Sequence, residues 1–136
     1  MPRLQFETQL LQELPSLANA ISVVTNGKIS TVFLTFKVQT NYLGEPVDGL
    51  ADEAQLWIWS IKSQAKSVSD IIKDSKVLLE IEKIFTKITN GPKVPIFEVL
   101  PFNYSISTND RHWQSKKKQL LASYKSRIND IYLATS

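Results

Sequence analysis

The chain contains no cysteine and a single histidine, and these two shortages exclude several kinds of site. Without cysteine there is no disulfide framework, no cysteine nucleophile and no Cys-rich zinc site. His112 alone does not make a zinc site, and no motif marks a nucleophile beside it, so we interpret it as an exposed residue at a helix start. The glycines, at positions 27, 44, 49 and 91, are spaced too widely for a glycine-rich phosphate loop.

Long apolar runs are also absent. No stretch approaches the roughly 20 apolar residues that a membrane-spanning helix requires. A secretory signal needs a continuous apolar run near its start, and here Glu7, Gln9, Gln12 and Glu13 interrupt it. We therefore expect a soluble intracellular protein, cytoplasmic or nuclear, with no membrane among its partners.

Composition predicts one ordinary globular domain covering residues 1–136. Of its residues 43% are hydrophobic and 21% are charged, and a chain of this length buries a core without a disulfide or metal to hold it. The charge is distributed unevenly. Residues 101–136 contain six Lys and Arg against two Asp and Glu, whereas residues 1–100 contain ten against eleven. The net charge of +3 therefore comes from the last part of the chain.

Several segments have apolar residues at helical spacing. Residues 3–14 predict a short helix that Pro15 ends. Between Leu50 and Asn90 there is neither glycine nor proline, and two apolar seams that do not line up predict helices near 51–73 and 76–89. The beginning of the second of these also fits a strand. Residues 110–133 predict a final, basic helix.

The strand signals lie on either side of the central helices. Asn26-Gly27 separates two β-branched runs, at 20–25 and 28–38, and predicts a hairpin because both turn residues adopt positive φ at low cost. The even-numbered residues of the second run are the more apolar and are expected to face the core. Residues 39–50 are rich in turn-forming types and predict a loop. Residues 94–102 predict a strand, and the prolines near its ends favour an edge position.

The predicted final helix is the first candidate for binding. It contains the cations and aromatic residues Arg111, Lys116, Lys117, Lys118, Lys125, Arg127, Trp113 and Tyr124. Cations beside aromatic rings are typical of a surface that follows a phosphate backbone, so we predict an acidic or nucleic-acid partner here. The alternative is a solvated amphipathic helix whose lysines lie along its apolar edge.

The second candidate is Leu56-Trp57-Ile58-Trp59. On a helix, Trp57 and Trp59 lie about 200° apart, so one of them is exposed, as is typical of an interface hot spot. On a strand both would share one face and fill the core. We predict a protein interface at this pair, with a buried structural role as the competing interpretation.

Asp74-Ser75-Lys76 has the carboxylate-x-lysine spacing of metal-dependent nucleases. That chemistry requires a second acidic side chain close by, for which Asp48 and Glu80 are the candidates. The triplet fits equally well a break between two helices.

These patterns predict an α+β fold: an N-terminal helix, an antiparallel hairpin with at least one further strand, a central helical segment, and a C-terminal basic helix packed on the sheet. The favoured function is a non-catalytic binding subunit of a larger assembly, with a protein partner or a second copy of the chain and with nucleic acid as a further candidate. No catalytic residue, metal, cofactor or small-molecule ligand is predicted. The alternative is a nucleic-acid-processing enzyme resembling metal-dependent nucleases, or its accessory subunit.

Overall fold

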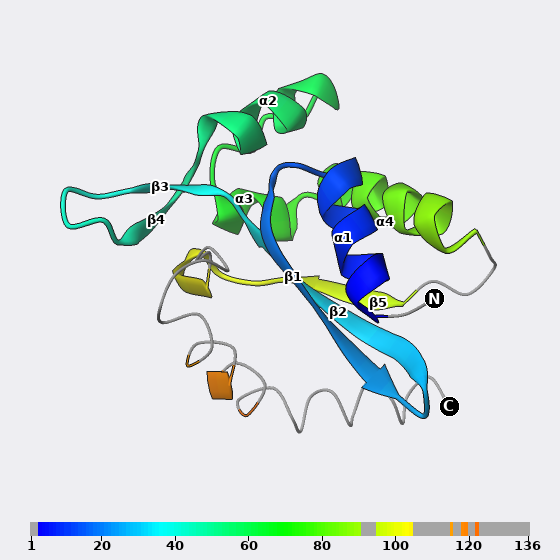
Figure 1. Ribbon diagram of the computed structural model, residues 1–136. Helices are drawn as coiled ribbons and strands as arrows, with labels where there is room; N and C mark the ends of the chain where they lie inside the picture. Colours follow the sequence, from blue (N-terminus) through cyan, green and yellow to red (C-terminus); the bar gives the residue numbers. More distant parts are fainter. Residues whose placement is uncertain (1–2, 91–94, 105–114, 116–117, 120–121, 123–136) are drawn as a thin grey trace.

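Helices and a mixed β-sheet make up the part of the chain that the structure describes. The computed structural model describes residues 3–90, 95–104, 115, 118–119 and 122 (Figure 1). In chain order the elements are α1 (Arg3–Glu13), β1 (Leu17–Thr25), β2 (Lys28–Phe36), β3 (Val38–Thr40), β4 (Pro46–Leu50), α2 (Asp52–Ser60), α3 (Val68–Lys73), α4 (Ser75–Thr89), β5 (Ile96–Val99) and the 3-10 helix η1 (Phe102–Tyr104). The predicted α+β fold is confirmed.

β1 and β2 form the hairpin that the Asn26-Gly27 pair predicts. The φ angles of these two residues are 54° and 76°, both positive, as a type I′ turn requires. The two strands pair antiparallel from Leu17 opposite Phe36 to Thr25 opposite Lys28. The turn chemistry thus sets the register next to the turn, and the register shifts between Val23 and Val24 and again between Leu17 and Asn19.

β5 adds the third strand of this sheet, in the order β1-β2-β5. It lies at an edge, as its flanking prolines predict. Its direction is parallel to β2, with Thr31 opposite Ile96 and Leu34 opposite Val99. A parallel pair needs a long crossover connection, and here the chain passes through β3, β4 and α2–α4 before it returns.

The hydrophobic core lies between this sheet and the helices α1 and α4. Phe85 of α4 contacts Phe6 of α1 in an edge-to-face arrangement, with ring centroids 5.8 Å apart. Three even-numbered residues of β2 belong to this core, as predicted, and have no exposed surface: Val32, Leu34 and Phe36. The odd-numbered Phe33 is also 1% exposed, so both faces of β2 are buried.

The prediction of a loop over residues 39–50 is wrong, because this segment contains β3 and β4. Val38 pairs with Leu50 and Thr40 with Pro46, which makes a second, two-stranded sheet. Of the turn-forming residues that suggested a loop, Asn41 and Gly44 lie at the turn, whereas Pro46, Asp48 and Gly49 lie within β4. At the turn the Asn41 Oδ1 atom accepts the backbone N–H of Leu43 at 2.9 Å. This hairpin projects away from the sheet and helices (Figure 1).

The predicted helix over 51–73 is also wrong in its extent, because the chain leaves the helix at Ser60 and re-enters one only at Val68. Lys62 has φ 63° and its N–H donates to the Trp59 carbonyl at 2.9 Å, while the Ser63 N–H donates to the Ile58 carbonyl at 3.0 Å. These two bonds form the Schellman motif that ends many helices, usually with glycine at the left-handed position. A lysine at that position leaves no sign of the break in the sequence.

The second central segment is a helix rather than a strand, and α4 ends where Asn90 adopts left-handed backbone angles, φ 49° and ψ 40°. Most of the predicted final helix lies outside the described residues, although 115, 118–119 and 122 are helical. Among the helices that the structure describes, none is long and apolar enough to cross a bilayer.

The left-handed lysine gives a test of the helix break. Lys62→Gly is expected to raise the free energy of unfolding by roughly 0.5–1 kcal/mol, because the Cβ clash of a non-glycine residue there exceeds the extra chain entropy that glycine loses. Urea denaturation followed by circular dichroism measures the change. Lys66→Gly, at an exposed lysine of the same loop without positive φ, is the control and should not stabilise. A Lys62→Gly protein less stable than the parent would contradict the assignment.

Candidate functional site

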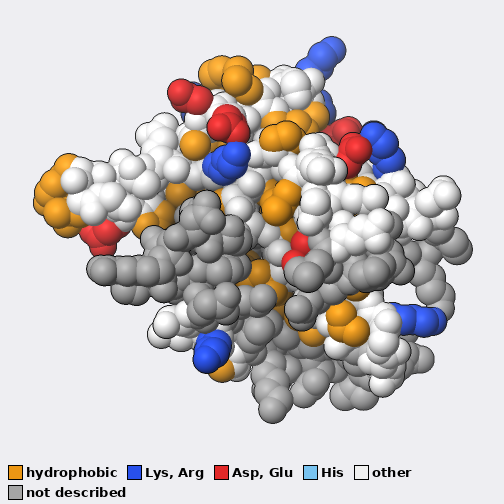
Figure 2. All heavy atoms as spheres, in the orientation of Figure 1, with side chains coloured by type: hydrophobic (Ala, Val, Ile, Leu, Met, Phe, Trp, Pro, Cys, Tyr) orange, Lys and Arg blue, Asp and Glu red, His pale blue; other side chains and the backbone are white. Residues whose placement is uncertain are grey.

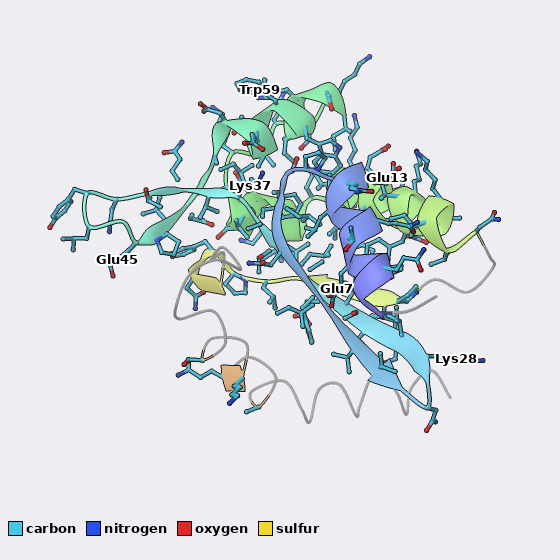
Figure 3. All side chains as sticks on the ribbon, in the orientation of Figure 1. Glu7, Glu13, Lys28, Lys37, Glu45 and Trp59 are labelled. Atoms are coloured by element: carbon cyan, nitrogen blue, oxygen red, sulfur yellow. The ribbon has the colours of Figure 1, made fainter. Side chains whose placement is uncertain are left out.

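α2 places its two tryptophans in different environments. Trp57 is half-buried, and its ring lies on the Phe36 ring of β2 with centroids 6.2 Å apart and planes inclined by 31°. Trp59 is 58% exposed, and Leu56, one turn earlier, is 62% exposed. Figure 3 shows Trp59 on the side of α2 away from the sheet. We call Leu56 and Trp59 the α2 outer surface. Trp59 is the exposed member of the predicted tryptophan pair.

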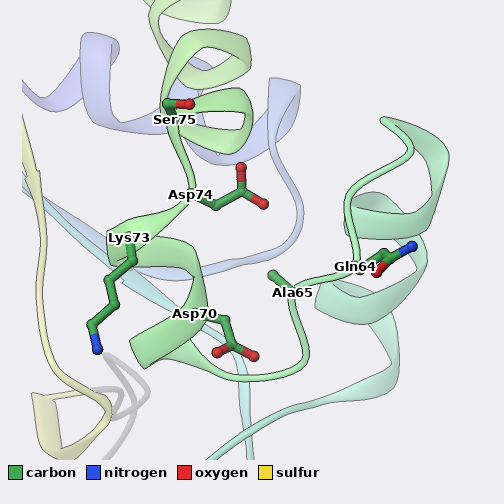
Figure 4. A pocket seen from close by; sticks show the side chains of 6 residues that line it. All are labelled: Gln64, Ala65, Asp70, Lys73, Asp74 and Ser75. Atoms are coloured by element: carbon green, nitrogen blue, oxygen red, sulfur yellow. The ribbon is translucent and has the colours of Figure 1, made fainter.

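A second feature is an open hollow of about 420 Å³ beside the junction of α3 and α4 (Figure 4). Its lining residues are Gln64, Ala65, Asp70, Lys73, Asp74 and Ser75. Its two carboxylates belong to Asp70 of α3 and to Asp74 between α3 and α4. Their hydrogen-bond partners show whether either carboxylate is available for binding or catalysis.

Asp74 ends α3 and caps α4. Its Oδ2 atom accepts the Ser63 hydroxyl at 2.6 Å, and its Oδ1 atom accepts the backbone N–H of Lys76 at 2.9 Å. The Ser63 hydroxyl is the largest of the influences that lower the pKa of Asp74 below its ordinary value of 3.8, with smaller contributions from backbone N–H groups and the Lys76 charge. Asp74 is therefore an ionised helix cap at neutral pH.

The other two acids near the hollow also bind backbone N–H groups. The Asp70 carboxylate accepts the Lys66 N–H at 3.0 Å, while the Ser67 hydroxyl accepts the Asp70 N–H at 3.1 Å, so the two side chains cap the start of α3 together. Asp48 of β4 accepts the Ser69 N–H at 3.0 Å. Each of these carboxylates accepts a hydrogen bond from a backbone N–H group at the start of a helix, and none is placed as a catalytic group.

The predicted nuclease-like triplet is therefore a break between helices. The Lys76 ammonium donates to the Lys62 carbonyl at 3.3 Å, and Glu80 pairs with Lys83 at 3.1 Å. Within the described ranges no three His, Cys, Asp or Glu side chains gather as they must to hold a metal ion. Sequence reasoning missed Ser63, the buried partner of Asp74, because the two are 11 residues apart and no local pattern links them.

The predicted basic binding surface lies largely beyond the described residues. Of its members only Lys118 is described, and it is exposed. Arg111, Lys116, Lys117, Lys125, Arg127, Trp113 and Tyr124 fall outside the described part of the chain.

The ionised cap makes a testable contribution to stability. Asp74→Ala is expected to lower the free energy of unfolding by about 0.5–2 kcal/mol at neutral pH, the usual effect of losing a helix N-cap. Because folding lowers the pKa of Asp74, the stabilisation by its charge is fully present above the unfolded pKa and is lost as the pH falls through the lower folded pKa. The difference between parent and variant should therefore shrink as the pH falls below 3.8.

Denaturant titrations of both proteins at neutral and acidic pH measure this difference. Ser63→Ala provides the matched control, since the Ser63 hydroxyl is the largest cause of the lowered pKa. In that background the further effect of Asp74→Ala should be smaller and less dependent on pH. A difference that stays constant with pH would contradict the role of the ionised carboxylate.

Comparisons with known proteins find similarity to part of several enzymes. No family model matches the chain, and no solved structure matches it. The chain is 28% identical over 142 residues to a long-chain-fatty-acid–CoA ligase, ACSBG2, of Xenopus laevis, covering 97% of this chain and 19% of that protein. The human ACSBG2 is 27% identical over 142 residues, covering 97% and 21%, and the ACSBG2 of Rattus norvegicus is 29% identical over 136 residues, covering 93% and 20%.

The chain thus spans about a fifth of the length of the curated relatives it matches. This similarity overturns the prediction of a non-catalytic binding subunit, because nearly the whole chain aligns with part of an enzyme. The nuclease-like alternative fails as well, since Asp48 and Asp74 cap helices and Glu80 pairs with Lys83. Exposed tryptophan and clustered cations occur in parts of enzymes as well as in binding subunits, so these features do not separate the two classes. What the chain is similar to is one portion of a fatty-acid–CoA ligase.

Proposed function

We propose that this chain is part of an enzyme that joins a long-chain fatty acid to coenzyme A. The observation that carries the proposal is an alignment along 97% of the chain with proteins named long-chain-fatty-acid–CoA ligase. Because the aligned part is about a fifth of each relative, the reaction would be shared with a larger remainder of the enzyme. The contribution of this chain would then be to hold ligand and to contact that remainder.

Coenzyme A is rich in phosphate, and the basic part of this chain suits such a ligand. We infer that the cations predicted to bind an acidic partner contact its phosphates, with Trp113 or Tyr124 stacking on its adenine ring: Arg111, Lys116, Lys117, Lys118, Lys125 and Arg127. The exposure of Lys118 supports this, since a phosphate-binding ammonium must be accessible. The acids of the hollow, in contrast, are already bonded to backbone N–H groups.

The α2 outer surface is the proposed contact with the remainder of the enzyme. Trp59 and Leu56 are adjacent on one side of α2, and both are more than half exposed. Tryptophan is one of the residue types enriched at interface hot spots, and a neighbouring apolar side chain such as Leu56 would help to exclude water around it. Trp57 would hold α2 in position for that contact, because its ring packs against the Phe36 ring of β2.

A chimera tests the function. Replacing the aligned segment of human ACSBG2 with this chain should give an enzyme that forms long-chain acyl-CoA, whereas a flexible linker of the same length in that place should give none. Acyl-CoA formation is measured with a radiolabelled fatty acid. A chimera that folds like the parent and is no more active than the linker control would contradict the proposal.

The same chimera separates ligand binding from folding. Reversing three charges with Lys116→Glu, Lys117→Glu and Lys118→Glu should raise the KM for coenzyme A and leave the KM for the fatty acid unchanged. Of these two substrates, only coenzyme A carries phosphates. Lys83→Glu, on the exposed side of α4, is the control charge reversal.

The interface is tested by expressing this chain and the remaining part of human ACSBG2 as two polypeptides. Trp59→Ala should weaken their association about tenfold or more, as truncation of an interface hot spot does. Leu79→Ala removes an apolar side chain that is 52% exposed on α4 and should have little effect. Equal weakening by both substitutions, measured by titration calorimetry, would reject the α2 outer surface as the contact.

A further inference from the structure

We propose that the turn of the β3–β4 hairpin, residues 41–45, is a contact site for a lipid surface. We call Tyr42 and Leu43 the hairpin tip. The choice of a lipid surface rests on the proposed function in one respect. A long-chain fatty acid partitions into bilayers, so an enzyme that consumes it has better access to its substrate when it is bound to a bilayer. The rest of the argument comes from the hairpin itself.

The hairpin tip is the most exposed apolar pair in the described part of the chain. Tyr42 is 95% exposed and Leu43 is 66% exposed, and the two are consecutive. The hairpin extends away from the sheet and helices (Figure 1), and apolar side chains cover its far end (Figure 2). Tyrosine is favoured at membrane–water interfaces, where its ring is apolar and its hydroxyl stays wet.

The turn backbone is already hydrogen-bonded within itself. The Asn41 N–H donates to the Glu45 carbonyl and the Gly44 N–H to the Asn41 carbonyl, both at 2.9 Å. The Asn41 Oδ1 atom accepts the Leu43 and Glu45 N–H groups at 2.9 and 3.0 Å. Moving an unpaired N–H group out of water is costly, and here four are paired before any contact. The same bonds hold the hairpin tip in one conformation, so binding costs little further conformational entropy.

Two side chains are too few for stable anchoring, because even a single myristoyl chain binds membranes only marginally. A cationic segment adds the second attraction that such contacts need. The sequence has six Lys and Arg between residues 111 and 127, the cations proposed above to contact coenzyme A, and an anionic lipid surface would attract the same charges. Glu45, the one charge in the turn itself, would not attract anionic lipid, which leaves the tip as an apolar contact.

The absence of cysteine makes the test direct. Leu43→Cys and Leu79→Cys, each labelled with an environment-sensitive fluorophore on the full chain, report the hairpin tip and an exposed leucine position of α4, which lies toward the other side of the molecule from the hairpin (Figure 1). With vesicles of phosphatidylcholine and phosphatidylserine, emission from position 43 should shift to the blue and intensify, and emission from position 79 should not change.

Matched substitutions measure the contribution of the tip. Leu43→Ser is expected to lower the vesicle partition coefficient of the unlabelled chain about tenfold, and Leu79→Ser to leave it unchanged. The chain failing to bind the vesicles, an unchanged label at position 43, or equal effects at both positions would each overturn the proposal. The tip would instead contact the remainder of the enzyme if Leu43→Ser lowered chimera activity equally on vesicle-held and on monomeric fatty acid, which would also overturn it.

The vesicle measurements involve no reaction, so their result is independent of the proposed function. Vesicle binding through position 43 together with an inactive chimera would retain the lipid contact and reject the ligase assignment. An active chimera whose hairpin tip stays in water would retain the ligase assignment and reject the lipid contact.

Discussion

The burial of β2 on both faces is the constraint on which the rest of the structure depends. Phe33 and Leu34, neighbours that point to opposite sides of the sheet, are 1% and 0% exposed. β1 and β5 bond to the two edges of β2, and the Leu100 N–H continues the β5 side by donating to the Leu34 carbonyl at 2.8 Å. α1 and α4 cover one face through a shared core. The end of β2 then positions α2, because Phe36 carries the Trp57 ring and Lys37 pairs with Glu53 at 2.6 Å.

Much of this fold could be predicted from local patterns, because local chemistry determined it. The β1–β2 turn needs positive φ at two positions, and Asn26-Gly27 supplies both. Apart from the β3–β4 hairpin, whose composition predicts a loop, two features could not be predicted from local patterns. The break after α2 uses lysine in a left-handed position, so the usual glycine signal is missing. The parallel direction of β5 depends on a crossover through five elements, and no residue within β5 encodes it.

The candidate site was predictable only in its composition. The tryptophan pair was correctly expected to divide into one exposed and one packed ring if it lay on a helix, since 100° per residue allows nothing else. The acidic residues were recognised as a possible metal site because spacing alone does not distinguish a ligand from a helix cap. That distinction depends on partners distant in sequence, as with Ser63 for Asp74 and Ser69 for Asp48. Once those acids are assigned to helix ends, no group of acids in the described ranges is left to hold a metal ion.

The two exposed apolar pairs differ in shape, and shape favours different occupants. Single exposed apolar side chains are common on soluble domains, whereas contiguous exposed apolar surface is what marks contact sites. Leu56 and Trp59 lie on the side of a helix that is supported by the core through Trp57, a broad surface that a second folded unit can cover. Tyr42 and Leu43 lie at the end of a narrow hairpin, where a protein partner would need a matching pit, while a fluid lipid surface adapts to the hairpin tip. The internal bonds of the turn satisfy the backbone that such a surface leaves unpaired.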